Sequence, residues 1–320
     1  MKNQISKIVK ALGIIALLTG VILPSFNLNT QTGNVAGLDN NNTAVTANTV
    51  TNLPWDLDKI NADGAWKSTN GGTSVIVAVL DTGIDANHQG LIGKVIDNIN
   101  FSHSSTSNDV NGHGTAVAGL IAASLENGKG TIGVAYNASL LNVKVADDSG
   151  IVSPEAVAKG IIWAIGKGAK VINMSFTLRE SSQTVEDAIN YAWSKGAVLI
   201  AAGGNVPNSK TTYPASYQNV ISVAGTDKND HMSNWACTGN WISVRAPNVD
   251  LCTTIPNGKY AMKSGTSFAA PLVTGEAALL LTIAKDTNCN GLTNDEVRAA
   301  ILNNTDAGRI DILKAVESLK

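Results

Sequence analysis

Five short runs of mainly apolar, largely β-branched residues most constrain how this 320-residue chain can fold. Runs that are apolar almost throughout suit strands covered on both faces, as in a parallel sheet. Helix signals separate the runs. Ser153 and Pro154 give an N-cap followed by proline at the first helical position, and Gly196 ends a second helix after Lys195. The runs span 75–80, 140–145, 171–174, 198–202 and 220–224.

This alternation of strands and helices predicts an α/β fold with three layers around a central, mainly parallel sheet. In such folds ligands bind beyond the carboxyl ends of the strands, so the polar residues that follow each run are the first candidates for chemistry. Only 15% of the residues are charged, and the net charge is −2. This balance, without long basic runs, argues against nucleic acid as a partner.

The first 52 residues differ in character from the rest of the chain. Lys2, Lys7 and Lys10 precede an apolar stretch over 11–23, which is too short for a comfortable transmembrane helix and is typical of a signal peptide. We expect a signal peptide over 1–25; the alternative is an uncleaved membrane anchor. Residues 26–52 are rich in Asn and Thr, and we expect a short pro-segment or disordered linker there. The globular domain then spans 53–320.

Three polar residues, each in a glycine-rich turn, follow or precede regular elements. They are Asp81 in AVLDTGID, His113 in NGHGTAVAG and Ser267 in SGTSFAAPLVTG. Taken singly, each has a structural interpretation: a turn former, a structural histidine and the N-cap of an apolar helix over 267–282. Taken together, they are the groups that nucleophilic catalysis needs, because a serine needs a base and the base needs an orienting carboxylate.

With these motifs the chain resembles the subtilisin-like serine proteases, or subtilases, in which Asp, His and Ser occur in this order. The resemblance covers about 54–320. It implies a subtilisin-like peptidase domain over 53–320 and the activity of a secreted serine endopeptidase. The matching motifs are AVLDTGID at 78–85, HGTAVAG at 113–119, VINMS at 171–175, AAGGN at 201–205 and SGTSFAAP at 264–271.

Site residues follow from the resemblance, position by position. It implies that Ser267 is the nucleophile that forms the acyl-enzyme, that His113 is the general base and then acid, and that Asp81 orients His113. Asn205 matches the side-chain donor to the oxyanion, together with the backbone N–H of Ser267. The implied substrate cleft has an edge at Ser175, Phe176 and Thr177, and a small-residue pocket at Ala202, Gly203, Gly204, Tyr213, Pro214 and Ala215.

Several departures from the family pattern concern metals and the region around the nucleophile. Phe268 replaces the usual Met after the serine, and Gly90 stands where an acid of the family's strong calcium site is usual. The stretch 286–291 opens like an EF-hand loop, but Val297 occupies the twelfth position, so we interpret it as an Asx-rich turn. We therefore expect no required cofactor, no strong metal site and at most weak calcium binding.

The chain has three cysteines, which are too few for a disulfide framework. Cys237 and Cys252 either pair with each other or remain buried thiols, and Cys289 is the third.

We expect polypeptide substrates, a monomer, secretion or cell-surface association, and membrane contact only through an uncleaved N-terminus. Two roles stay open, a broad degradative protease and a leader-peptide processing protease of the lanthipeptide type. A binding module that has lost activity is the non-enzyme alternative.

Overall fold

The computed structural model describes residues 33–34, 44–45, 53–207 and 211–320. The expected signal peptide lies outside these residues, and so does the expected linker, apart from two short strands, β1 (Gly33–Asn34) and β2 (Ala44–Val45). None of the described helices is long and apolar enough to cross a membrane.

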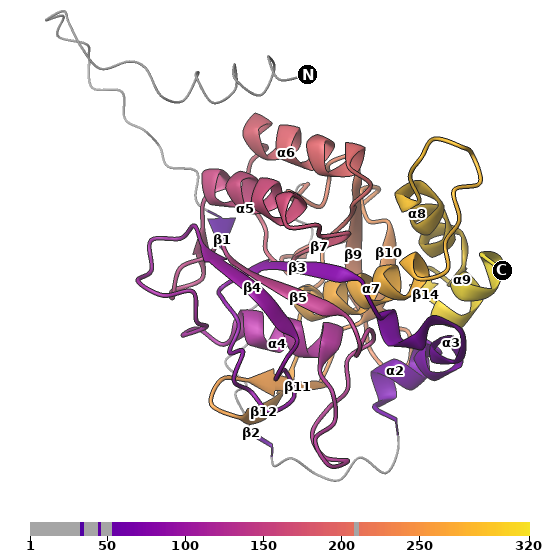
Figure 1. Cartoon of the computed structure of the whole chain (residues 1–320), viewed down its shortest axis with the longest axis horizontal. Helices are drawn as coiled ribbons and strands as arrows, with labels where there is room; N and C mark the ends of the chain where they lie inside the picture. Colours follow the sequence, from indigo (N-terminus) through magenta and orange to yellow (C-terminus); the bar gives the residue numbers. More distant parts are fainter. Residues whose placement is uncertain (1–32, 35–43, 46–52, 208–210) are drawn as a thin grey trace, which may run out of the picture. The chain divides into compact units, whose positions relative to one another are not determined.

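Nine strands of the described chain form one central sheet (Figure 1). Its order is β13-β14-β10-β9-β8-β7-β3-β5-β4, and every neighbouring pair is parallel except β13 and β14. Each of the five apolar runs forms one strand of the sheet, which confirms the predicted mainly parallel α/β fold. The strands are β3 (Ile76–Asp81), β4 (Val95–Asn100), β5 (Ser139–Lys144), β7 (Val171–Met174), β8 (Val198–Ala202), β9 (Val220–Thr226), β10 (Val244–Pro247), β13 (Thr305–Asp306) and β14 (Arg309–Ile310).

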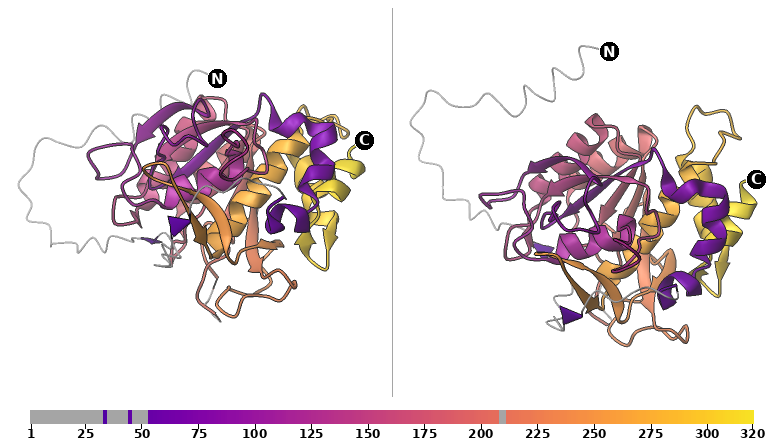
Figure 2. Two further views of the ribbon diagram at one scale, coloured as in Figure 1. Left: turned by 90° about the horizontal axis from the view of Figure 1, so that it is seen from below. Right: turned by 60° about the horizontal axis from the view of Figure 1, so that its bottom comes forward.

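Two smaller pairings involve the short strands. β6 (Ile151–Val152) pairs with β1, and the hairpin of β11 (Leu251–Ile255) and β12 (Lys259–Lys263) pairs with β2. In Figure 2 the hairpin is the orange pair of arrows beside α4, and β11 packs against that helix.

Helices cover both faces of the sheet, which gives the predicted three layers. Along β3, Val77 and Val79 face the core that contains α4 and α7, whereas Ala78 and Leu80 face the core of α5 and α6. This period of two is what a strand buried on both faces requires. The helices are α2 (Trp55–Lys59), α3 (Ala62–Thr69), the 3-10 turn η1 (Asn70–Gly72), α4 (His113–Ala122), α5 (Pro154–Gly166), α6 (Gln183–Ser194), α7 (Thr266–Leu281), α8 (Asn294–Asn303) and α9 (Ile312–Ser318).

The helix start predicted at Ser153 is confirmed. The Ser153 side chain accepts a hydrogen bond from the backbone N–H of Ala156 at 3.2 Å, and Pro154 is the first residue of α5. Gly196 follows α6 with a φ of +80°, the left-handed conformation that a helix end favours.

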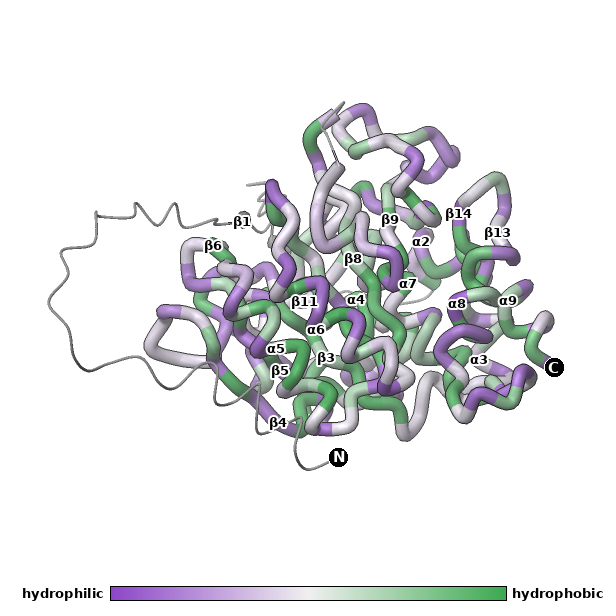
Figure 3. The backbone as a smooth tube through the Cα atoms, turned by 90° about the horizontal axis from the view of Figure 1, so that it is seen from above, coloured by the Kyte–Doolittle hydropathy of each residue, from purple (hydrophilic) through white to green (hydrophobic). Residues whose placement is uncertain are grey.

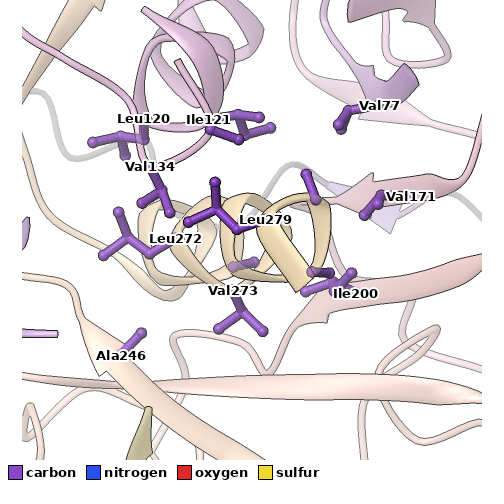
Figure 4. Packing of buried hydrophobic residues seen from close by; sticks show 14 of the residues in the cluster. Val77, Leu120, Ile121, Val134, Val171, Ile200, Ala246, Leu272, Val273 and Leu279 are labelled. Carbon is purple, nitrogen blue, oxygen red and sulfur yellow. The ribbon is translucent and has the colours of Figure 1, made fainter. Parts of the chain in front are cut away.

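Helix α7 is mostly apolar and is buried from Thr266 to Leu280. A helix of this kind is stable only inside a core. Leu272, Val273 and Leu279 contact side chains from α4 and from the sheet, as Figure 4 shows, and the hydrophobic colouring in Figure 3 runs through α7 and β8. Because α7 is held on all sides, its N-terminus, which carries Ser267, has a defined position beside the sheet.

Candidate active site

The structure places Asp81 and His113 side by side. Asp81 is the last residue of β3, and His113 is the first residue of α4. Oδ1 of Asp81 lies 2.8 Å from Nδ1 of His113, and both side chains are almost fully buried. The backbone N–H of Thr82 donates to the same carboxylate oxygen at 2.7 Å, so the carboxylate is held from its own turn as well.

The far nitrogen of the His113 ring has the character of a base. A carboxylate that accepts from Nδ1 favours the tautomer with its proton on that atom, which leaves a lone pair on Nε2. His113 Nε2 is buried and has no hydrogen-bond partner among the described residues. The ring of Phe268, the residue after Ser267, packs against the imidazole with 5.3 Å between ring centroids.

Ser267 is the second residue of α7 and is fully buried. Its hydroxyl donates to the carbonyl of Ser175 at 3.0 Å, and the Ser175 hydroxyl donates back to the carbonyl of Ser267 at 2.8 Å. The second bond has a local cause. Pro271 lacks the N–H that would bond the Ser267 carbonyl within the helix, and the Ser175 hydroxyl replaces it. The end of β7 is thereby joined to the start of α7.

Asn205 follows β8 and contacts the same helix start. Its Oδ1 accepts from the backbone N–H of Thr266 at 2.9 Å and from the Thr266 hydroxyl at 2.8 Å. These bonds fix which end of the amide faces Thr266 and leave Nδ2 beside Gly265, where a Cβ would lie 3.4 Å from it. Gly265 has a φ of +145°, a conformation that favours glycine. An amide donor and the N-terminus of α7 are thus adjacent, and both favour negative charge.

Some of the residues expected to line the substrate cleft lie close to one another. A Cβ on Gly204 would lie within 3.5 Å of Thr177, and Leu178 pairs with Tyr213 through two backbone hydrogen bonds of 2.6 and 3.1 Å. The Tyr213–Pro214 peptide bond is cis. The Phe176 side chain is fully buried in the core of α5 and α6, so only its backbone is available to a ligand. A separate cavity of about 550 Å³ lies between α8, α9 and the C-terminus, and none of the expected cleft residues lines it.

The described residues form no group of three or more His, Cys, Asp or Glu side chains placed to hold a metal. In the turn where the family's strong calcium site usually has an acid, the backbone N–H of Gly90 donates to His88 Nδ1 at 3.1 Å. In the Asx-rich stretch before α8, Asp286 accepts from the backbone of Asn290 and Gly291.

No disulfide links the cysteines. The Cys237 thiol donates to the Val206 carbonyl at 3.1 Å, so the pairing with Cys252 that the sequence left open does not form in this structure.

The sequence interpretation missed a layer of buried polar residues behind the pair of Asp81 and His113. Asp109, Thr115 and Lys144 are almost fully buried there. One signal was available, because Lys144 is a charged residue inside an otherwise buried strand and so requires polar partners.

The chain is similar to known proteins over most of its length. The model of the subtilase family, Peptidase_S8, matches residues 72–316. Thermitase from Thermoactinomyces vulgaris is 41% identical over 270 residues, covering 81% of this chain and 94% of that protein. Subtilisin DY from Bacillus licheniformis is 39% identical over 235 residues, 72% of this chain and 85% of its own length. A thermophilic serine proteinase from Bacillus sp. (strain AK1) is 42% identical over 240 residues, which are 75% of this chain and 58% of that protein.

Proposed function

Since the chain belongs to the subtilase family and is a serine endopeptidase acting on polypeptides, we propose that it cleaves peptide bonds through an acyl-enzyme on Ser267. The observation that carries the proposal is the buried 2.8 Å contact between Asp81 and His113, which leaves His113 Nε2 without a hydrogen-bond partner within the described chain. A base of this kind is what a serine hydroxyl needs in order to lose its proton.

In the proposed acylation, the Ser267 hydroxyl rotates away from the Ser175 carbonyl and donates its proton to His113 Nε2. Ser267 Oγ forms a bond to the scissile carbonyl carbon, and the C=O pair moves to oxygen as an oxyanion. Collapse of this intermediate breaks the C–N bond, and His113 returns the proton to the leaving amine. Water then repeats both steps on the ester and releases the acid. Asp81 keeps its contact with Nδ1 throughout and stabilises the imidazolium.

The oxyanion of this scheme would form beside the N-terminus of α7. Asn205 Nδ2 and the backbone N–H of Ser267 are the proposed donors. The two hydrogen bonds from Thr266 to Asn205 Oδ1 support this assignment, because they orient the amide before substrate arrives. Donors that are already oriented need no reorganisation during the reaction.

We propose that an extended substrate lies along 175–177 and that a pocket of small residues at 202–204 and 213–215 receives the residue before the scissile bond. These pocket segments contain no Asp or Glu, so the proposed preference is not for Arg or Lys. The protein is proposed to be a secreted monomer that requires no cofactor. The basic and apolar N-terminal segment supports secretion, and cell-surface association would follow if that segment is retained.

The sequence offers a specialised alternative to a broad degradative protease, namely removal of leader peptides of the lanthipeptide type. Cleavage-site profiling on a peptide library separates the two roles. A degradative enzyme cleaves many sites that share only a preference before the scissile bond. A processing enzyme cleaves few sites and depends on several neighbouring residues.

The decisive experiment is Ser267→Ala, with Ser318→Ala on the exposed face of α9 as the matched control. We expect Ser267→Ala to lose peptide hydrolysis by several orders of magnitude and to keep the parent circular dichroism spectrum. The control should keep full activity. Turnover by a folded Ser267→Ala protein would overturn the assignment of the nucleophile.

A further inference from the structure

A buried carboxylate, Asp109, lies behind the pair of Asp81 and His113 and is only 6% exposed. It accepts four hydrogen bonds. Oδ1 accepts from the Thr82 hydroxyl at 2.9 Å and from the backbone N–H of Gly112 at 2.7 Å. Oδ2 accepts from the backbone N–H of Thr115 at 2.8 Å and from its hydroxyl at 2.6 Å. These four acceptor contacts offset part of the cost of burying this carboxylate, although burial still raises the pKa of Asp109 above its ordinary value of 3.8.

The four donors come from the two segments that carry Asp81 and His113. Thr82 follows Asp81, and its hydroxyl also accepts from the backbone N–H of Gly114 at 2.9 Å. Gly112 and Thr115 flank His113 on either side. Asp109 therefore joins the turn after β3 to the first turn of α4, although these segments are about 30 residues apart in the chain.

The junction leaves little freedom for the two segments to slide. A Cβ on Gly114 would lie 2.1 Å from the carbonyl oxygen of Gly83 and 3.1 Å from the Cβ of Asp81, so the backbones are already in contact. On the other side, the fully buried Lys144 donates to the Thr82 carbonyl and to Asp148 Oδ1, the latter at 2.8 Å. Thr82 is thus held at its hydroxyl by Asp109 and at its carbonyl by Lys144.

We propose that Asp109 is a positioning residue for the reaction, which acts by holding Asp81 and His113 in hydrogen-bonding register. It does not contact the reacting atoms; it acts through Thr82, Gly112 and Thr115. The inference rests on the proposed function, because it assigns a task to a residue behind the proposed base.

The geometry makes a carboxylate necessary at this position. Each oxygen of Asp109 accepts from one backbone N–H, that of Gly112 on Oδ1 and that of Thr115 on Oδ2. A hydroxyl can turn to accept instead of donating, but a backbone N–H cannot. In Asp109→Asn, the new NH₂ group therefore faces a backbone N–H donor in either orientation of the amide. The segments must move apart although the side chain keeps its size.

The test is Asp109→Asn in the full chain, with kcat and KM measured on a peptide substrate and Tm measured on the same preparations. We expect kcat to fall about 10- to 100-fold, since a misplacement of about 1 Å costs a factor of that order. KM should stay within about twofold, because the proposed cleft residues are not involved. A kcat within twofold of the parent value in folded protein would overturn the proposal.

Thr115→Val provides a second, milder variant in case Asp109→Asn does not fold. It keeps the volume of the side chain and removes one of the four bonds to Asp109, together with the 3.0 Å bond from the Asp85 N–H. We expect a kcat lowered several-fold with KM little changed. An unchanged kcat in this variant counts against the proposal even if Asp109→Asn cannot be purified.

Two further variants distinguish the possible failures. Asp311→Asn alters another buried carboxylate, which caps α9 and accepts from the Lys314 N–H at 3.2 Å. It should lower Tm and leave kcat at the parent value; a kcat loss equal to that of Asp109→Asn would mean that kcat merely follows stability, and would overturn the proposal. Ser267→Ala serves as the reference, because activity in this variant would overturn the proposed function itself. If Ser267→Ala is inactive and Asp109→Asn is fully active, only the positioning role of Asp109 is overturned.

Discussion

Two buried carboxyl groups, Asp109 at the carboxyl edge of the sheet and Glu276 in the middle of α7, have opposite surroundings. Asp109 accepts four hydrogen bonds. Neither oxygen of Glu276 has a partner among the described residues, although the side chain is fully buried. Burial, and secondarily the charge of Asp311, raises the pKa of Glu276 well above its ordinary value of 4.5.

The difference separates a region that supports chemistry from a region that supports only stability. At the sheet edge, hydrogen bonds offset part of the cost of burying polar groups, and in the proposed role of Asp109 they also set the position of His113. Inside α7 the same cost is not offset, because neither oxygen of Glu276 has a hydrogen-bond partner within the described chain. Substitutions at the edge should therefore change kcat, whether or not they also lower Tm, whereas a substitution at Glu276 should change Tm and leave kcat unchanged.

After Ser267→Ala, the largest effect is expected for Asn205→Ala at the sheet edge. Loss of one oxyanion donor costs about 10²–10³ in kcat, and KM should change little, because the amide bonds the developing oxyanion more strongly than the ground-state carbonyl. Steady-state kinetics and a thermal melt on the same samples measure both sides of the comparison. A large rise in KM with unchanged kcat would contradict the proposed role of Asn205.

A several-fold effect is expected for oxidation beside His113. Phe268 packs against the imidazole and offers no thioether, whereas Met in its place would become a polar sulfoxide under peroxide. Phe268→Met should lose activity several-fold faster than the parent in dilute hydrogen peroxide. Residual activity over time provides the measurement, and equal rates for the two proteins would show that this contact does not control sensitivity to oxidation.

The smallest effect, a few degrees in Tm, is expected for Glu276→Met in the core. In the folded parent the carboxyl group stays protonated to a higher pH than in the unfolded chain. The unfolded state therefore loses its proton first, and stability falls as pH rises above about 4.5. Removing an unpartnered polar group should stabilise by about 1–3 kcal/mol, and each kcal/mol corresponds to roughly 2–4 °C.

The matched control for this prediction is Glu276→Gln, which cannot ionise but stays polar. Melts at pH 5 and pH 8 should show a gain in Tm for Glu276→Met that is larger at pH 8. Glu276→Gln should reduce the dependence of Tm on pH to the same extent, with a smaller gain at pH 5. Unchanged kcat in both variants would sharpen the contrast with Asn205→Ala. A lower Tm for Glu276→Met at both pH values would refute the prediction that removal of the Glu276 carboxyl group stabilises the fold.

Local patterns explain how much of the fold could be predicted. The apolar runs became strands because each is buried on both faces, and Ser153 caps α5 because its side chain needs only a backbone N–H three residues ahead. The same holds for the candidate site. Asp81 and His113 could be found because each lies in a short motif at the end of an element, and the resemblance to subtilases extended this to Ser267 and Asn205.

Sequence by itself therefore determined the α/β fold, the family and the candidate residues, since these depend on periodicity and on motifs of neighbouring residues. Only the tertiary structure decided that Asp109 has four donors, that Glu276 has none among the described residues and that Ser175 replaces the N–H that Pro271 lacks. The physical reason is common to all three. Whether a buried polar atom is satisfied depends on groups that come from distant segments, and the packing of strands and helices alone brings those groups within about 3 Å.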